Sequence, residues 1–521
     1  MTPVLSASLP PPPDRFNIAR YCLAAQARAC PDKTALVIVG DGGDERSWSF
    51  RDLDLMVRRL AGGLLAMGAR PGQRLMIRMS NDLPYLLAFF GGFAAGLVSF
   101  PSSAALTEEE ADFLLEDSEA AWIAVSDALA FHHVLPAGVR TLDDADILRL
   151  AEAGPALDYA DTAATDAAFL IYTSGTTGRP KGVLHGHRVA WGRRPMVQGW
   201  YGLSADDVML HAGAFNWTYT LGVGLLDPWA NGATAVLYSG AADPAVWPEL
   251  IARHRVTLFA TVPSLYRRIL KYGDVSPAKL ATLRHGLTAG EALPPALLEA
   301  WRARTGKELY EALGMSEIST YVSTGPGMAV RPGSPGKPQA GRRVAILDPE
   351  TGAPLPSGET GLLAVHRSDP GLILGYWKRP EEEALVYRGE WFAGGDLAHL
   401  DEDGYLWFHG RNDDILNTQG YRLSPLEIEG VLAHHRGVAE VAVGEITLSD
   451  GVTVLAAFVV PHGQPDEAAI LDWSREHLAA YKRPRRVVFL DRLPRTANGK
   501  LRRTNLPSQQ LEDRGNQGVG V

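Results

Sequence analysis

Helical patterns alternate with short β-rich runs between about residues 49 and 259, and this alternation restricts the fold more than any other feature of the chain. Residues 52–68 have a helical pattern, whereas residues 73–79 and 120–126 have the composition of strands. Strands that alternate with helices form βαβ units, whose sheets are largely parallel. The pattern therefore predicts an α/β protein.

Three later strand-like runs, residues 256–264, 283–294 and 308–317, each lead into a loop rich in small or polar residues. Ligands of α/β proteins bind at the carboxyl ends of the strands. We therefore expect one sheet to present these three loops together.

The pattern changes after about Val344 to short strands and turns, which predicts a β-rich subdomain. A boundary is expected near Asn412, because the surrounding run GRNDDILNTQGYRLSP is polar and lacks strong periodicity. Beyond it, three strand-like runs and an amphipathic helix at residues 468–481 are enough for a small α+β domain. We therefore divide the chain into domains at residues 1–411 and 412–521.

Composition is that of an ordinary soluble enzyme, with 46% hydrophobic and 21% charged residues among 521. The net charge of −10 argues against general affinity for nucleic acid or acidic lipid. Two cysteines, Cys22 and Cys30, and the lack of an export signal favour the cytoplasm. The longest uncharged stretch, residues 85–100, is shorter than the ~20 residues of a membrane span. We expect no membrane span and no nucleic-acid partner.

The run YTSGTTGRPKG, residues 172–182, has the composition of a loop that binds a polyphosphate. Its glycines let main-chain N–H groups approach anionic oxygens, its hydroxyls donate hydrogen bonds, and Lys181 supplies a movable positive charge. The alternative is an ordinary turn, which explains GTTG but not the whole run. The loop is not a Walker A sequence, and it follows a strand-like run at residues 167–173. It therefore predicts an ATP site at the end of a buried strand.

Several further motifs follow in order, and with the glycine-rich loop they make the chain resemble the adenylate-forming acyl-CoA synthetases over about residues 16–503. That family joins a carboxylic acid to the α-phosphorus of ATP, and the thiol of coenzyme A then displaces AMP. The resemblance implies ATP, Mg²⁺ and coenzyme A as ligands. It also implies a large N-terminal domain of two packed, mostly parallel α/β subdomains with a β-rich subdomain, and a small mobile α+β C-terminal domain. The motifs are TAGEALP (288–294), LGMSE (313–317), GSPGKP (333–338), WFAGGD (391–396), GRNDD (410–414), GYRLSPLEIE (420–429) and PRTANGK (494–500).

By this resemblance Lys500 bridges the acid and the α-phosphate and offsets the repulsion between two anions. Glu317 carries Mg²⁺, and Ser316 contacts the α-phosphate with the hydroxyl that replaces a usual threonine. The alternatives are a solvated surface lysine and a carboxylate at a helix start.

The resemblance also implies a nucleotide site in which Asp396 and Arg411 hold the ribose, although Asp396 has the alternative of a turn residue. Leu313 stands where many relatives have a stacking tyrosine, and Gly394 replaces a common threonine, so we expect weaker ATP binding. The residues expected to bind ATP are Thr173, Ser174, Gly175, Thr176, Thr177, Lys181, Gly290, Glu291, Ala292, Leu313, Asp396 and Arg411.

Asp413 matches the hinge about which the small domain of this family rotates between the two half-reactions. In the second state, Gly420, Tyr421 and Arg422 would approach the pantetheine arm of coenzyme A or AMP. The alternative is an exposed linker.

The acid pocket is expected beneath the run HAGAFNWTYTLG, although aromatic residues in such a run are more often core. Acetate-specific relatives carry a tryptophan at the place of Gly314, so acetate is a poor candidate. We expect an apolar acid, either medium-chain aliphatic, aryl or alicyclic. The residues expected to line the pocket are Trp217, Tyr219, Thr220, Val262, Ala289 and Gly314.

Three rival functions are a stand-alone adenylation enzyme that loads a carrier protein, a luciferase-like oxidase and a catalytically idle adenylate-binding protein. No carrier motif follows Lys500, and an idle protein has no need of that lysine. Because related ligases are acetylated at a lysine so placed, a lysine acetyltransferase acting on Lys500 is a further expected partner. The sequence is compatible with a monomer or a homodimer.

Overall fold

The computed structural model describes residues 9–133, 135–174, 180–241, 243–411, 416–418, 421–423, 425–447, 453–478, 482–495 and 501–507. The chain divides into two compact units. The first contains residues 1–345, 364–394 and 400–407, and the second contains residues 346–363, 395–399 and 408–521.

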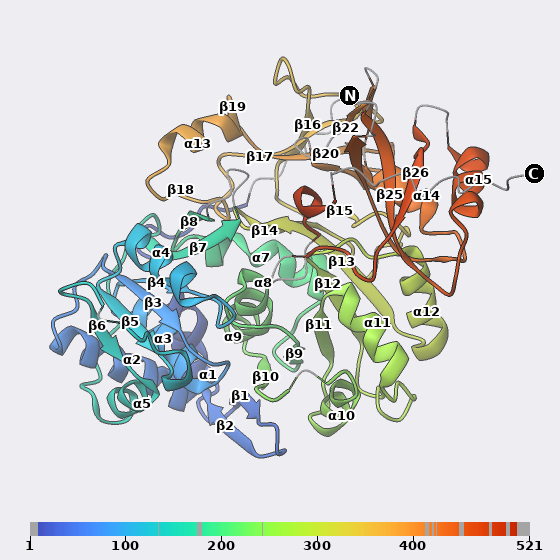
Figure 1. Ribbon diagram of the computed structural model, residues 1–521. Coiled ribbons are helices and arrows are strands. Elements are labelled where there is room, and N and C mark those ends of the chain that lie inside the picture. Colours follow the sequence, from blue (N-terminus) through green and yellow to red (C-terminus); the bar gives the residue numbers. More distant parts are fainter. Residues whose placement is uncertain are drawn as a thin grey trace, which may run out of the picture. The chain divides into compact units, whose positions relative to one another are not determined.

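A seven-stranded sheet lies in the first unit, in the order β18-β8-β7-β4-β3-β5-β6 (Figure 1). Its strands from β7 to β6 pair in parallel, whereas β8 and β18 join its edge in antiparallel fashion. The bounds are β3 (Arg74–Arg78), β4 (Val98–Pro101), β5 (Trp122–Val125), β6 (Arg140–Leu142), β7 (Ala167–Ser174), β8 (Pro180–Gly186) and β18 (Gly375–Tyr376).

A nine-stranded sheet follows the order β15-β14-β13-β12-β11-β9-β10-β1-β2. Its strands from β13 to β1 are parallel, which confirms the βαβ organisation expected from the alternating pattern. The bounds are β1 (Thr34–Val39), β2 (Glu45–Ser49), β9 (Val208–His211), β10 (Thr234–Tyr238), β11 (Leu258–Thr261), β12 (His285–Ala289), β13 (Glu308–Met315), β14 (Ser319–Ser323) and β15 (Lys337–Pro338).

The helices begin where the sequence supplies caps and pack where it supplies small residues. Ser49 and Asp52 form a capping box at the start of α2 (Phe50–Ala66). All of α3 (Leu83–Ala94) is buried, and a Cβ at Gly91 would lie 2.6 Å from Leu60 on α2, so glycine permits this close packing. The other helices of this unit are α1 (Ala25–Ala29), α4 (Glu108–Ser118), α5 (Asp144–Ala153), α6 (Val189–Gly192), α7 (Arg194–Met196), α8 (Thr218–Leu221), α9 (Asp227–Ala230), α10 (Val246–Arg253), α11 (Pro263–Tyr272), α12 (Pro295–Thr305) and α13 (Pro380–Val386).

The expected β-rich region is a five-stranded sheet in the order β16-β17-β20-β19, with β21 paired to β20. Later in the chain, β22 and β23 form a two-stranded sheet, and β24, β25 and β26 a three-stranded sheet. Two helices, α14 (Pro425–Leu432) and α15 (Glu467–His477), accompany these last strands, as the α+β pattern predicts. The bounds are β16 (Val344–Leu347), β17 (Gly361–His366), β19 (Tyr387–Arg388), β20 (Trp391–Leu400), β21 (Leu406–Arg411), β22 (Leu416–Thr418), β23 (Tyr421–Leu423), β24 (Val438–Thr447), β25 (Thr453–Pro461) and β26 (Arg486–Phe489).

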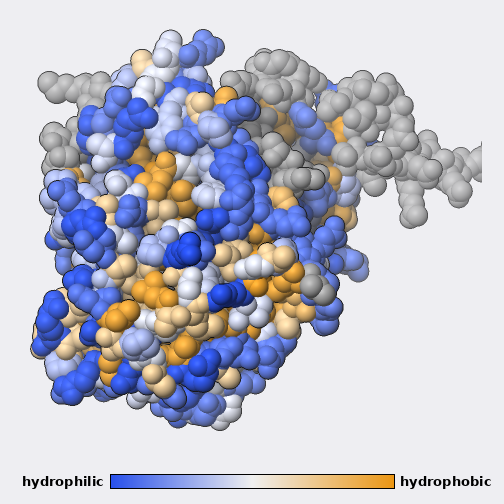
Figure 2. Space-filling view, turned by 90° about the vertical axis from the view of Figure 1, so that its left-hand side faces the viewer, coloured by the Kyte–Doolittle hydropathy of each residue, from blue (hydrophilic) through white to orange (hydrophobic). Residues whose placement is uncertain are grey.

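Hydrophobic residues are interspersed among hydrophilic ones on the face drawn in Figure 2. Among the described residues, no helix is both long and apolar enough to cross a bilayer. The uncharged stretch at residues 85–100 lies in the buried helix α3, the strand β4 and the connection between them.

Candidate functional site

The three loops expected at one sheet edge follow three neighbouring parallel strands. β11 pairs with β12, and β12 pairs with β13, each in parallel register. Their carboxyl ends therefore lie at the same edge, where Val262, Gly290 and Ser316 begin the loops. Gly290 has φ +89°, a conformation that favours glycine, and a Cβ added there would lie 3.9 Å from Val262. The structure thus confirms the predicted grouping of these loops.

A tight turn joins β13 to β14 and carries Ser316 and Glu317. The Ile318 N–H donates to the Met315 carbonyl at 3.2 Å. Glu317 lies in this turn and not at a helix start, so the helix-dipole alternative is wrong. Its backbone carbonyl accepts from the Ile373 N–H at 3.0 Å, and its half-buried carboxylate accepts from the Tyr376 hydroxyl at 2.8 Å. The carboxylate is therefore held in one direction.

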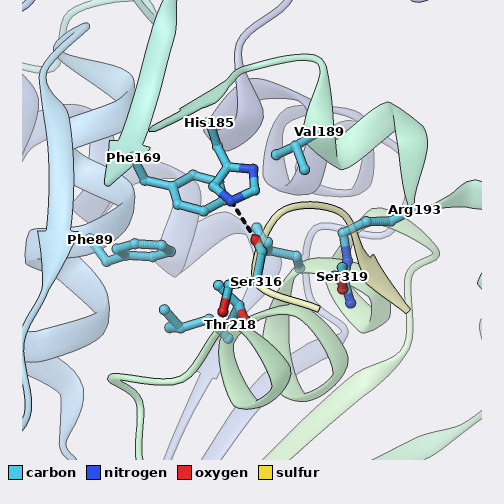
Figure 3. A pocket seen from close by; sticks show the side chains of 10 residues that line it. Phe89, Phe169, His185, Val189, Arg193, Thr218, Ser316 and Ser319 are labelled. Atoms are coloured by element: carbon cyan, nitrogen blue, oxygen red, sulfur yellow. Dashed lines mark hydrogen bonds between the residues drawn. The ribbon is translucent and has the colours of Figure 1, made fainter. Parts of the chain in front are cut away.

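A buried histidine supports the turn from β8. His185 is 1% exposed, and its Nε2 lies 2.9 Å from the Ser316 carbonyl oxygen, to which it donates (Figure 3). Its ring stacks on Phe169 at 4.5 Å between centroids. Burial lowers the pKa of His185 to about 3, so the imidazole is neutral at physiological pH. A neutral ring that donates from Nε2 carries its acceptor at Nδ1.

A small cavity lies beside this histidine and Ser316 (Figure 3). Its volume is about 20 Å³, a little more than one water molecule requires. The His185 Nδ1 is buried and has no hydrogen-bond partner among the described residues. None of the six residues expected to form the acid pocket lines this cavity, so it is not the predicted pocket. Its lining residues are Phe89, Phe169, His185, Val189, Arg193, Thr218, Leu221, Leu226, Ser316 and Ser319.

An ion pair in the core holds the far end of the turn. Arg193 and Asp227 have side chains 4% and 6% exposed and are joined by hydrogen bonds of 2.6–3.1 Å. The Tyr201 hydroxyl donates to the same carboxylate at 2.7 Å. The Arg193 guanidinium also donates to the Ser319 hydroxyl. Ser319 has φ +72°, which is costly for a residue with a Cβ, so the arginine fixes a strained residue at the end of the turn.

The glycine-rich loop is anchored at both ends by paired strands. β7 and β8 are antiparallel, with Thr173 opposite Lys181, which confirms that the loop follows a buried strand. The Lys181 Nζ lies 3.9 Å from the centroid of the Tyr376 ring and 3.6 Å from a Glu382 carboxylate oxygen. Residues 175–179, including Gly175, Thr176 and Thr177, and the side chain of Ser174 lie outside the described part.

Of the residues expected in the acid pocket, Tyr219 contacts strands of the nine-stranded sheet. The Tyr219 hydroxyl lies 3.3 Å from the Thr261 carbonyl and 3.4 Å from the Leu287 carbonyl, and burial raises its pKa. Thr220 is fully buried, and Ala289 is 3% exposed. Trp217 and Val262 are half-buried. The polar end of Tyr219 therefore faces β11 and β12.

The neighbouring strand β14 approaches Gly314 closely. A Cβ at this position would overlap the carbonyl oxygen of Ser319 and lie 2.7 Å from the Thr320 Cα. Gly314 lies next to a register shift between β13 and β14, where the two backbones approach closely. Contact with β14 therefore explains this glycine without reference to the length of an acid. Leu313, on the other side of the shift, pairs with Val322.

The residues expected at the ribose lie on two strands of the second unit. Asp396 lies within β20, so the alternative interpretation of Asp396 as a turn residue is wrong. The Arg411 guanidinium on β21 lies 3.6 Å from its carboxylate. In the first unit, a Cβ at Gly394 would lie 2.7 Å from the Met315 sulfur. The Met315 side chain therefore occupies the space that the side chain of the threonine common in relatives would take at position 394.

The expected hinge residue Asp413, the coenzyme A residue Gly420 and the catalytic Lys500 lie outside the described residues. Tyr421 and Arg422 have a described backbone on β23, opposite Thr418 and Asn417.

Family models match both parts of the chain. The AMP-binding enzyme model matches residues 23–377, and the model of the AMP-binding enzyme C-terminal domain matches residues 427–500. The chain belongs to the AMP-binding enzyme family. This confirms the resemblance to adenylate-forming acyl-CoA synthetases and the fold class expected from it.

Curated relatives of this AMP-binding enzyme are similar along nearly their whole length. The chain is 32% identical to 3-hydroxybenzoate–CoA ligase of Aromatoleum sp. (strain CIB), covering 92% of this chain and 94% of the relative. It is 33% identical to the mitochondrial acyl-coenzyme A synthetase ACSM5 of Homo sapiens, covering 96% and 91%. The solved structure of the anthranilate CoA ligase AuaEII in complex with anthranoyl-AMP has a TM-score of 0.85 and 30% identity, covering 94% and 96%.

A buried carboxyl that the sequence analysis did not consider supports the loop at residues 290–292. Glu311 on β13 is 9% exposed, and its side chain accepts a hydrogen bond from the Leu293 N–H at 2.9 Å. Burial raises the pKa of Glu311 to about 7. An acidic residue between the apolar residues Leu309 and Ala312–Leu313 was the signal available in the sequence.

Glu311→Gln is expected to stabilise the AMP-binding enzyme at pH 8 by about 1–3 kcal/mol and to have little effect at pH 4. The raised pKa means that neutral Glu311 makes its full contribution to the free energy of unfolding below about pH 4.5. This contribution is lost as the pH rises through about 7, because the buried carboxyl then ionises. Glutamine keeps an acceptor for the Leu293 N–H and does not ionise. Urea unfolding of the variant across this pH range measures the difference.

The exposed Glu350→Gln serves as the matched control and should not change the pH dependence of stability. Parallel stability curves for Glu311→Gln and the unaltered protein would contradict the expected ionisation.

Proposed function

We propose that this AMP-binding enzyme is an ATP-dependent acid–CoA ligase for an apolar carboxylic acid. A carboxylate oxygen attacks the α-phosphorus of ATP, and the bond to the β-phosphate breaks to release pyrophosphate. The thiolate of coenzyme A then attacks the acyl carbon, and the acyl–oxygen bond breaks to release AMP. The observation that carries the proposal is the sheet edge at which the loops after β11, β12 and β13 meet beside a firmly held Glu317.

In this proposal, Lys181 and Ser316 are the residues of the first unit that contact the phosphates of ATP. Lys181 is a movable ammonium at the end of the glycine-rich loop, and Ser316 offers a hydroxyl on the turn. Positive charge and hydroxyl donors at these places stabilise the charge that develops on the α-phosphate oxygens.

Glu317 fits Mg²⁺, which prefers oxygen ligands and takes one or two carboxylates together with phosphate oxygens. The carboxylate is half-buried and accepts a hydrogen bond from the Tyr376 hydroxyl at 2.8 Å. Among the described residues, no group of three histidine, cysteine or acidic side chains is gathered for a metal ion. The remaining ligands would therefore come from the nucleotide and water. A bound Mg²⁺ would neutralise phosphate charge as the new bond forms.

The order of the motifs supports the roles proposed for the later residues. Asp396 and Arg411 hold the ribose, and Lys500 brings its charge to the two reacting anions. Asp413 is the hinge, and residues 420–422 serve the coenzyme A step.

The substrate we propose is an aryl or medium-chain acid. Relatives named for 3-hydroxybenzoate and benzoate, and a solved ligase that holds anthranoyl-AMP, support an aryl acid. The similarity to the acyl-coenzyme A synthetases ACSM3 and ACSM5 supports an acyl substrate without distinguishing aryl from aliphatic acids. Trp217, Tyr219, Thr220, Val262, Ala289 and Gly314 remain the proposed pocket.

Purified protein is expected to form AMP from ATP when benzoate or octanoate and coenzyme A are both present, and at least about tenfold less with acetate. An apolar pocket favours the longer acids because each buried CH₂ contributes about 0.8 kcal/mol. Coupled measurement of AMP across an acid panel tests this. AMP formed only with a carrier protein, or ATP binding without turnover for any acid, would favour the rival functions and contradict the proposal.

Lys500→Gln, which mimics acetylation by removing the charge, is expected to lower the rate of adenylation by about 10²-fold or more. Its thiolysis of a supplied acyl-adenylate should stay within about threefold of the unaltered protein. Pyrophosphate release and acyl-CoA formation measure the two steps. Lys482→Gln, a lysine paired with Glu427, is the matched control. Equal loss of both half-reactions would contradict the assigned role and the regulatory value of acetylation.

A further inference from the structure

Tyr376 lies between the two motifs to which the proposed function assigns phosphate and metal binding. It occupies β18, which pairs with β8 so that Tyr376 is opposite Val183. Side chains two residues apart on a strand share a face, so Lys181 is the diagonal neighbour of Tyr376. The Trp377 N–H donates to the Gly182 carbonyl at 2.8 Å and extends this pairing. The tyrosine is 6% exposed and therefore fixed in place.

The side chain makes two different contacts with charged groups. Its hydroxyl donates to Oε1 of Glu317 at 2.8 Å, and its ring centroid lies 3.9 Å from the Nζ of Lys181. The first contact orients an anion through a charge-assisted hydrogen bond, and the second attracts a cation to the aromatic face. One rigid ring therefore touches both groups.

Lys181 has a second neighbour of opposite charge. Glu382 on α13 lies 3.6 Å from its Nζ, so the ammonium is placed between an aromatic face and a carboxylate. A triphosphate carries more negative charge than one carboxylate and attracts this ammonium more strongly. Bound ATP would therefore compete with Glu382 for this ammonium.

We propose that Tyr376 is a positioning residue that couples Lys181 to Glu317, so that the phosphate-binding cation and the metal-binding carboxylate keep a fixed relation. Glu382 holds Lys181 in the absence of nucleotide. This inference rests on the proposed function, because it takes Lys181 as a phosphate ligand and Glu317 as a Mg²⁺ ligand.

The two contacts of Tyr376 are separable by substitution. Tyr376→Phe keeps the ring under Lys181 and removes the hydroxyl from Glu317, whereas Tyr376→Leu removes both. Isothermal titration calorimetry of the full chain with ATP, in Mg²⁺ and in EDTA, measures the affinity for ATP with and without the metal. The acid is left out, so that no reaction occurs. Tyr376→Phe is expected to weaken ATP binding about tenfold in Mg²⁺ and to leave it unchanged in EDTA. Tyr376→Leu is expected to weaken it under both conditions.

Glu382→Gln is expected to tighten ATP binding in EDTA about threefold, because Lys181 no longer leaves a carboxylate. Unchanged affinity would overturn the role of Glu382.

Tyr405→Phe is the matched control, because this tyrosine is also buried, donates to the Ala329 carbonyl and lies beneath Arg331 and Lys337. This variant should show the same difference in ATP affinity between Mg²⁺ and EDTA as the unaltered protein. If Glu317→Gln weakens ATP binding in Mg²⁺ and Tyr376→Phe does not, the coupling is overturned alone. If Glu317→Gln also binds like the unaltered protein, the metal role in the proposed function fails and the coupling fails with it.

Discussion

The turn between β13 and β14 depends on buried groups that hold it in one conformation. Ser319 ends this turn with φ +72°, a strain that costs about 1–3 kcal/mol. The Arg193 guanidinium holds its hydroxyl, and the guanidinium is itself held by Asp227 in the core. His185 fixes the turn through the Ser316 carbonyl. The side chains of Ser316 and Glu317, for which we propose catalytic roles, can therefore remain partly exposed while their backbone is anchored to the core.

One face of β8 carries both a residue that holds the turn and the lysine at the end of the glycine-rich loop. Lys181, Val183 and His185 alternate along the strand and share a face. His185 reaches the turn directly, and Lys181 reaches it through Tyr376. This arrangement places a cation and a carboxylate at adjoining motifs in a protein whose net charge is −10. Because the overall charge repels ATP, such local cations must supply the attraction.

Sequence reasoning succeeded where a pattern was continuous along the chain. The helix α2, the strand before the glycine-rich loop and the three loops at one sheet edge follow from periodicity and from the rule for parallel strands. It failed where the decisive contact was distant in sequence. The contact between Tyr376 and Glu317 joins residues 59 positions apart through the pairing of β18 with β8. It also failed at Gly314, where the decisive contact is local: the backbone of Ser319 and Thr320 on β14, and not the acid, accounts for the glycine.

If a carboxylate oxygen attacks the α-phosphorus of ATP, an ¹⁸O label in the acid must follow that oxygen into the products. The protein would be supplied with ATP, coenzyme A and a carboxylic acid labelled with ¹⁸O, and the products would be analysed by mass spectrometry. We expect one ¹⁸O atom in the phosphate of AMP and none in pyrophosphate. Label that appears in inorganic phosphate or pyrophosphate, with unlabelled AMP, would contradict this expectation.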